Sequence, residues 1–192
     1  MKWTEERVAT AIATTLFDWR RNVVVPNLSW GLGLGWEVDL GVLSDAGWFT
    51  EVEIKVSIAD FKKDAEKWRH RLEASPGHES KTRRKFYAMP HEINEKRNGY
   101  GMREDLPIPP GYGLIVVTGG HNGDAAKIVQ EAPVNQAARK LRADEQRDMM
   151  RLGYIRFWAQ RDATALAQAG LLRAFEEHIT RAVEKLPAEE PA

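Results

Sequence analysis

Two neighbouring stretches of the chain alternate apolar and polar residues with a period of two, the pattern typical of β-strands. In residues 37–42 and 51–56, every second residue is valine, leucine or isoleucine. The polar positions between them are mostly charged: Glu37, Asp39, Glu51, Glu53 and Lys55. The pattern predicts two strands, each with one face towards a core and a charged face pointing outward.

The segment between these stretches is rich in turn-forming residues and predicts a β-hairpin. A three-residue loop places Gly47 where a type I turn followed by a bulge requires positive φ. In that register Ser44 pairs with Trp48, and Asp39 lies opposite Glu53. A two-residue loop would turn the apolar residues of the second strand to the charged side, which their pattern excludes. We therefore expect the two carboxylates to lie side by side.

Opposed carboxylates predict a site for a cation. Like charges in facing positions destabilise a sheet unless a cation or a proton lies between them. A cluster of oxygen ligands without cysteine suits Mg²⁺, with Mn²⁺ as an alternative. The same register places Glu37 opposite Lys55 and Glu51 one step before Glu53, and both glutamates are accessory candidates. The alternative interpretation is a solvated strand edge with scattered charges.

A basic helix is predicted directly after the second strand. Ser57 and Asp60 have the spacing of a capping box, and apolar residues then follow at intervals of three and four as far as Leu72. The remaining surface of this helix includes three lysines: Lys62, Lys63 and Lys67.

A second group of cations lies shortly downstream, at Lys81, Arg83, Arg84 and Lys85. Between residues 55 and 85 the sequence has ten lysines or arginines and five aspartates or glutamates. Because the whole chain has no net charge, this local surplus predicts a surface that binds DNA phosphates. For residues 81–85 the alternative is a solvated loop.

An aspartate on one strand followed by Glu-X-Lys on the next resembles the core of the PD-(D/E)XK nucleases, with Asp39, Glu53 and Lys55 at the motif positions. Residues 52–61, with Asp64 and nearby positions, are similar to the MmcB-like proteins, a bacterial family of proposed DNA-repair endonucleases. Shorter similarities extend this resemblance over roughly residues 3–158. Two departures from the family pattern are the absence of a proline before Asp39 and the presence of Asn27 where relatives often have glutamate.

The resemblance implies an α/β, restriction-endonuclease-like fold, in which helices flank a mixed sheet. It also implies hydrolysis of phosphodiester bonds in DNA, with Asp39 and Glu53 holding Mg²⁺ and Lys55 positioning water or stabilising charge. In many nucleases of this kind a glutamate of the first helix joins the site. Glu5 and Glu6 are the candidates, although a role in starting the helix is the favoured interpretation for both.

The remaining periodicity predicts a first helix from Thr4 to Arg21 with Trp19 on its buried stripe, and a short strand at 23–26. A polar connection is expected at 90–110. Further strands are expected at 85–89, 112–118 and 126–130.

The C-terminal part predicts helices at 135–158, with a break or kink at Gly153, and at 162–186. We therefore expect a nuclease-like domain over 1–160 and a C-terminal helix over 161–186. That helix either covers the core or joins two copies as a homodimer. A disordered tail is expected at 187–192.

Composition restricts the function classes. The chain has 192 residues, 43% of them hydrophobic and 29% charged, and it contains no cysteine. These values fit a globular cytoplasmic protein without a signal peptide or a membrane partner. Zero net charge means that DNA binding needs a local basic surface. Two other functions stay open: a catalytically inactive nuclease-fold module that binds nucleic acid or another partner, and a metal-dependent phosphoesterase for small molecules.

Overall fold

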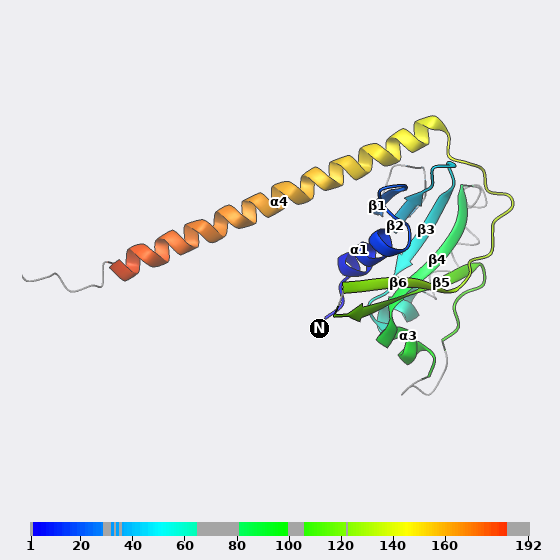
Figure 1. Cartoon of the computed structure of the whole chain (residues 1–192), viewed down its shortest axis with the longest axis horizontal. Coiled ribbons are helices and arrows are strands. Elements are labelled where there is room, and N and C mark those ends of the chain that lie inside the picture. Colours follow the sequence, from blue (N-terminus) through cyan, green and yellow to red (C-terminus); the bar gives the residue numbers. More distant parts are fainter. Residues whose placement is uncertain are drawn as a thin grey trace, which may run out of the picture. The chain divides into compact units, whose positions relative to one another are not determined.

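Figure 1 shows a computed structural model of the chain, which describes residues 2–28, 32, 34, 36–64, 81–99, 106–121 and 123–183, with side chains as far as residue 164. The chain divides into two units, Met1–Gly153 and Tyr154–Ala192. The predicted tail at 187–192 lies outside the described residues. No helix in the described part has the length and apolar character needed to cross a bilayer.

The first unit is built on a mixed sheet, as the sequence predicts for an α/β protein. In the described residues six strands lie in the order of the sequence. Neighbouring strands are antiparallel except for the pairs β3–β4 and β4–β5, which are parallel. The strands are β1 (Val23–Leu28), β2 (Val38–Leu43), β3 (Phe49–Ile54), β4 (Thr82–Pro90), β5 (Tyr112–Gly120) and β6 (Gly123–Gln130).

The hairpin of β2 and β3 has the predicted register. Gly41 pairs with Glu51. At the turn, the Ser44 amide donates to the Trp48 carbonyl over 3.0 Å, and the Gly47 amide donates to the Ser44 carbonyl over 2.8 Å. Gly47 has φ of 82°, a value that side-chain-bearing residues rarely adopt. The glycine thus fixes the loop length and, with it, which residues face each other.

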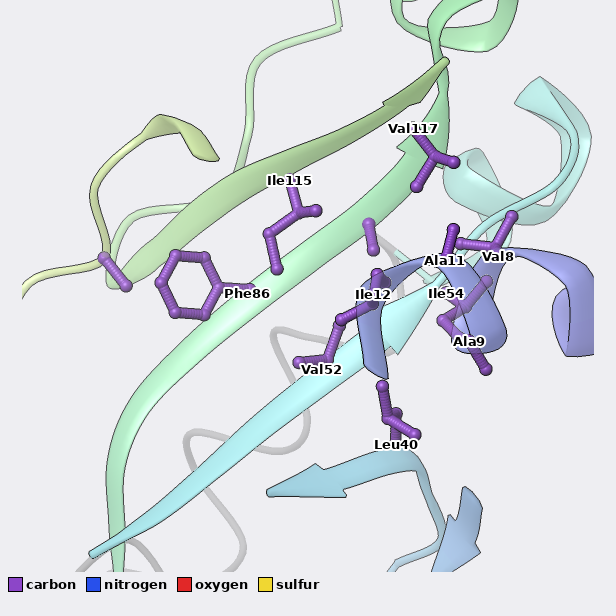
Figure 2. Packing of buried hydrophobic residues seen from close by; sticks show 12 residues of the cluster. Val8, Ala9, Ala11, Ile12, Leu40, Val52, Ile54, Phe86, Ile115 and Val117 are labelled. Atoms are coloured by element: carbon purple, nitrogen blue, oxygen red, sulfur yellow. The ribbon is translucent and has the colours of Figure 1, made fainter. Parts of the chain in front are cut away.

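One face of the sheet is covered by α1 (Glu5–Thr15), which the hydroxyl of Thr4 caps by accepting from the Arg7 amide. Figure 2 shows Ile12 and its neighbours on α1 packed against residues of β2 to β5, including Val52. The prediction of a helix as far as Arg21 is wrong. The chain turns after Thr15, with φ of 42° at Asp18. Trp19, predicted to be buried, is 54% exposed.

The other face of the sheet is also buried, which corrects the prediction of an outward charged face. Residues 58–64 are helical and start at Ser57, whose hydroxyl accepts from the Asp60 amide. Phe61 of this helix packs with Tyr87 in one apolar cluster. A second cluster covers the neighbouring strands: Val25, Leu28, Leu32, Leu34, Val38, Leu43, Phe49, Leu141 and Met149. Glu51 and Glu53 therefore lie on the internal strand β3, and Lys55 directly follows it, on a face of the sheet that other residues cover.

Several predicted boundaries differ from the structure. The polar connection after β4 contains a short helix, α3 (His91–Arg97). Residues 131–142 have no regular structure apart from one turn, and α4 (Ala143–Val183) is one continuous helix. The predicted break at Gly153 is wrong because this glycine serves packing. A Cβ atom there would lie 3.1 Å from a methyl group of Val25.

Candidate carboxylate and lysine site

Asp39 and Glu53 come from neighbouring strands and lie in register. Leu40 pairs with Val52, and Asp39 and Glu53 are the next residues on the two strands beyond this pair. The Ile54 amide donates to Oδ2 of Asp39 over 2.7 Å, so the side chain of Asp39 reaches across to β3. This hydrogen bond holds the first carboxylate beside the second, as the hairpin register predicts.

Burial disfavours the ionised form of both carboxylates. Glu53 is 5% exposed and Asp39 is half-buried. Burial raises the pKa of Glu53, and the charge of Asp39 raises this pKa further, against the lowering effect of Lys55. Burial also raises the pKa of Asp39, although the Ile54 amide and Lys55 oppose it. A cation beside both groups would relieve this penalty.

Lys55 lies between carboxylates. Its Nζ is 2.9 Å from Oε1 of Glu53 and 3.7 Å from Oδ1 of Asp64. Burial lowers the pKa of this ammonium group, but the charges of Glu53, Asp64 and Asp39 together outweigh burial and leave the pKa raised. The group therefore stays a cation at neutral pH.

Asp64 and Tyr87 belong to the same network, and neither was selected as a site residue from the sequence. The Tyr87 hydroxyl donates to Oδ2 of Asp64 over 2.7 Å. Burial and Asp64 together raise the pKa of Tyr87, so the hydroxyl keeps its proton. A signal existed: Asp64 follows Phe61 by three positions, which places a charge on the buried side of an amphipathic helix.

The accessory candidates occupy different places. Glu51 is 1% exposed, and its Oε1 accepts from the indole nitrogen of Trp36 over 3.2 Å. The expected pairing of Glu37 with Lys55 is not seen among the described residues. Glu37 is exposed and precedes β2, whereas the Lys55 amide donates to β4 at the Ala88 carbonyl over 2.9 Å.

The two glutamates of the first helix separate in the structure. Glu5 is exposed, and its charge raises the pKa of Asp39, so Glu5 is within electrostatic reach of the site. Glu6 instead lines a surface pocket together with Arg7 and Asp124. Of these two glutamates, Glu5 is the one whose charge raises the pKa of Asp39.

Asp39 and Glu53 are the two carboxylates of this site that could hold a divalent cation, and they are only two protein ligands. Oε2 of Glu53 is buried and has no hydrogen-bond partner among the described residues. This oxygen therefore accepts no hydrogen bond from them and is available as a metal ligand. Within those residues, no three histidine, aspartate or glutamate side chains gather closely enough to hold a metal ion. Mg²⁺ commonly binds one or two carboxylates and completes its shell with water and substrate oxygens, which agrees with this donor set.

The predicted basic surface has one exposed part and one part engaged within the protein. Lys62 and Lys63 are exposed on the helix that follows Ser57, and Lys67 lies outside the described residues. Residues 82–85 belong to β4, so the solvated-loop interpretation is wrong for them, whereas Lys81 lies in the turn before this strand.

Each cation of that run contacts another part of the chain. Lys81 lies 3.2 Å from Glu145, and Arg84 lies 2.7 Å from Glu131. Arg83 lies 4.3 Å from the centre of the Trp48 ring. Lys85 lies 5.9 Å from the centre of the Trp36 ring and 5.8 Å from that of Tyr112.

Comparison with known proteins relates the chain to one solved structure of similar fold. The SPO1766 protein from Silicibacter pomeroyi, a protein of unknown function, superimposes with a TM-score of 0.52 at 24% sequence identity over 98% of each chain. No family model matches the chain, and no curated protein matches it. At this identity the likeness concerns the fold alone.

Proposed function

We propose that this protein is a metal-dependent DNA endonuclease with a restriction-endonuclease-like fold. The observation that carries the proposal is the grouping of half-buried Asp39 on β2, buried Glu53 on β3 and buried Lys55 just after β3, in which one oxygen of Glu53 has no protein partner among the described residues. An unpartnered buried carboxylate oxygen costs stability. The presence of this costly unpartnered oxygen is explained if the site also binds a cation and a phosphate.

The chemistry proposed is hydrolysis of a phosphodiester bond. A bound Mg²⁺ would supply charge at the phosphate and acidify a water molecule. Asp39 and Glu53 would hold the ion. Lys55 would donate a hydrogen bond to the attacking water or to a phosphate oxygen as negative charge develops there. The water oxygen forms a bond to phosphorus, the bond from phosphorus to one ester oxygen breaks, and that oxygen leaves with a proton.

The arrangement of elements supports the nuclease assignment. An antiparallel hairpin carries the aspartate and the Glu-X-Lys sequence, two parallel strand pairs follow, and a helix starts at Ser57 directly after the lysine. Lys62 and Lys63 are exposed on that helix. These two lysines supply exposed positive charge shortly after the carboxylates in the sequence. Binding of DNA phosphates requires such exposed cations.

A cleavage assay tests the proposal. The purified full-length protein is incubated with labelled single-stranded, duplex and branched DNA in Mg²⁺, Mn²⁺ or EDTA. We expect cleavage with either metal, none with EDTA, and a loss of at least about a hundredfold for Asp39→Asn. Glu37→Gln is the matched control, because it removes an exposed carboxylate of the same segment and should leave cleavage unchanged. Metal-independent cleavage, or full activity of Asp39→Asn, would refute the metal mechanism.

A second candidate is a nucleic-acid-binding module that keeps the fold without cutting. The observation that favours it is the burial of Lys55, which is 5% exposed and pairs with Glu53 over 2.9 Å. DNA binding by a folded protein without cleavage under any metal condition would support this candidate over the nuclease.

A further inference from the structure

The second unit carries large apolar side chains that nothing in the described structure covers. All residues from 154 to 164 are exposed. Tyr154 is 64% exposed, Phe157 56% and Trp158 43%. The ring of Trp158 lies 5.9 Å from that of Tyr154 and 5.5 Å from that of Phe157, centre to centre, in edge-to-face arrangements. A cluster of this kind on a helix surface marks an interaction site.

This cluster is the start of a stripe that follows the helix to its end. With about 100° per residue, Tyr154, Phe157, Trp158 and Arg161 fall on one face. The same face continues through positions that are mainly apolar in sequence: Ala165, Ala169, Leu172, Phe175, Ile179 and Val183. Its only polar positions after residue 158 are Arg161, Gln168 and Glu176.

The length of this face indicates another helix as its partner. Residues 154–183 span about 45 Å at 1.5 Å per residue. A helix with a continuous apolar stripe gains its stability by burying that stripe. A partner must therefore be as long and as apolar, and must accommodate one cation and one anion.

We propose that this face binds the same face of a second copy of the chain, with the two helices antiparallel. Ten of the twelve positions of the stripe are self-complementary about a point between residues 168 and 169. When the helices run in opposite directions about that point, the following positions face each other: Tyr154 and Val183, Trp158 and Ile179, Arg161 and Glu176, Ala165 and Leu172, Gln168 and Ala169. The two remaining positions of the stripe, Phe157 and Phe175, lie at its border and face Thr180 and Asp162.

Charge and size select the antiparallel direction. Each Arg161 then faces Glu176 of the other copy, and because of the two-fold symmetry the pair occurs twice. Small Ala165 faces larger Leu172, so the packing alternates in size. A parallel pair in the same register would place arginine opposite arginine and glutamate opposite glutamate, which is unfavourable at an interface.

Charge reversal tests the partner and the direction together. Sedimentation of the full-length protein should show a dimer, weakened by roughly a hundredfold in Arg161→Glu or Glu176→Arg because each change creates two like-charge pairs. The double variant should recover the dimer, and so should an equimolar mixture of the two single variants. Arg156→Glu is the control, because it makes the same charge change about 200° round the helix from Tyr154.

Cross-linking gives an independent measurement. The chain has no cysteine, so Gln168→Cys introduces a single thiol next to the proposed two-fold axis and should form a disulfide-linked dimer on mild oxidation. Val183→Cys, at the far end of the stripe, should not cross-link with itself. A monomeric wild-type protein at about 100 µM, or a double variant that stays as weak as the single ones, would overturn the proposal. A wild-type monomer whose stripe binds its own core or anionic vesicles would overturn it equally.

Discussion

At the scale of single residues, the two carboxylate oxygens of Glu53 have opposite effects on stability. One of its oxygens accepts from Lys55 over 2.9 Å, which stabilises both charges. The other is buried without a partner among the described residues, and burial raises the pKa of the group. Buried ionised groups of this kind destabilise a fold unless they are fully paired. The site is therefore expected to be more stable with a cation than without one.

The first prediction concerns metal binding. Folding raises the pKa of Asp39 and Glu53, so without an ion their contribution to stability is largest below about pH 4 and falls as the pH rises through the raised folded-state values. At pH 7.5 both groups are then unfavourable when ionised, and 10 mM Mn²⁺ binding with a millimolar Kd should add about 1.4 kcal/mol. A thermal scan should show a rise in Tm of a few degrees.

The matched variant for this measurement is Asp39→Asn, which retains an oxygen to accept from the Ile54 amide. Without metal at pH 7.5, we expect its Tm to equal or exceed that of the wild type, and Mn²⁺ should add little. An equal Mn²⁺ effect in both proteins would exclude Asp39 as a ligand.

The second prediction concerns the hydrogen bond from Tyr87 to Asp64. Tyr87→Phe leaves a buried carboxylate oxygen with one donor fewer and should cost about 1–3 kcal/mol in urea denaturation. Tyr154→Phe removes the same atom from an exposed tyrosine and should change stability by less than about 0.5 kcal/mol. Asp64→Asn keeps an acceptor for Tyr87 but removes a charge 3.7 Å from Lys55.

The two variants of this network separate structure from catalysis. If the charge of Asp64 positions Lys55, Asp64→Asn should lower kcat more than it changes KM for DNA, because Lys55 acts as charge develops. If cleavage by Asp64→Asn equals that of the wild type, Asp64 serves the fold alone.

At the scale of elements, the hairpin was predictable because two constraints agree. The alternation around Val52 requires the apolar residues of both strands to face the same side, and the glycine at position 47 favours a three-residue loop. Both constraints give the same register, so the pairing of Gly41 with Glu51 follows from local sequence. Contacts distant in sequence were not predictable in this way. The burial of the charged face depends on Phe61 and Tyr87, which come from other elements.

Other misjudged elements share a physical cause. The sequence pattern of α1 continues as far as Trp19, but the helix ends at Thr15 and the chain then turns through a positive φ at Asp18, which no periodicity reveals. Glycine has a low helix propensity, which is why the sequence predicts a break at Gly153. In the structure this glycine allows close packing against Val25. In both cases tertiary structure overrides the local signal.

The third prediction concerns the start of α4, where Glu145 is 5% exposed. Two nitrogens of Arg139 donate to its oxygens, each over 2.7 Å, and Lys81 lies 3.2 Å away. The hydrogen bonds from Arg139 are the largest of the effects that lower its pKa from 4.5 to about 2. A lowered pKa contributes stability above about pH 4.5 that is lost as the pH falls towards 2.

Glu145→Gln should therefore lose about 3 kcal/mol of stability at pH 7, and the difference from the wild type should shrink between pH 4.5 and 2. Urea denaturation at several pH values measures this. Asp144→Asn removes an exposed neighbouring carboxylate that pairs with Arg142, and it should change stability far less than Glu145→Gln does. A constant difference across this pH range would show that Glu145 acts through packing rather than charge.

At the scale of the whole molecule, a neutral chain must bind DNA through a local surface if it binds DNA at all. The structure divides the predicted cations into two kinds. Lys62 and Lys63 are exposed, so their charges can exchange counterions for phosphates. Arg83 and Arg84 already contact Trp48 and Glu131, so their removal should affect the fold more than the affinity for DNA.

The fourth prediction follows from this division. The affinity for duplex DNA should fall linearly with salt on logarithmic axes, by about 0.9 for each phosphate contact. Lys62→Gln combined with Lys63→Gln should weaken binding to all sequences alike and reduce that slope by up to about 1.8. Fluorescence anisotropy at several salt concentrations measures both quantities.

Two comparisons make this result specific to the helix after Ser57. Lys127→Gln removes an exposed cation from β6, at the opposite edge of the sheet from β1, and should leave the slope unchanged. Arg83→Gln should lower Tm through the loss of its contact with Trp48 while the slope changes little. If the double lysine variant keeps the wild-type slope while Arg83→Gln flattens it, the DNA contacts β4 rather than this helix, and the phosphate surface must be placed there instead.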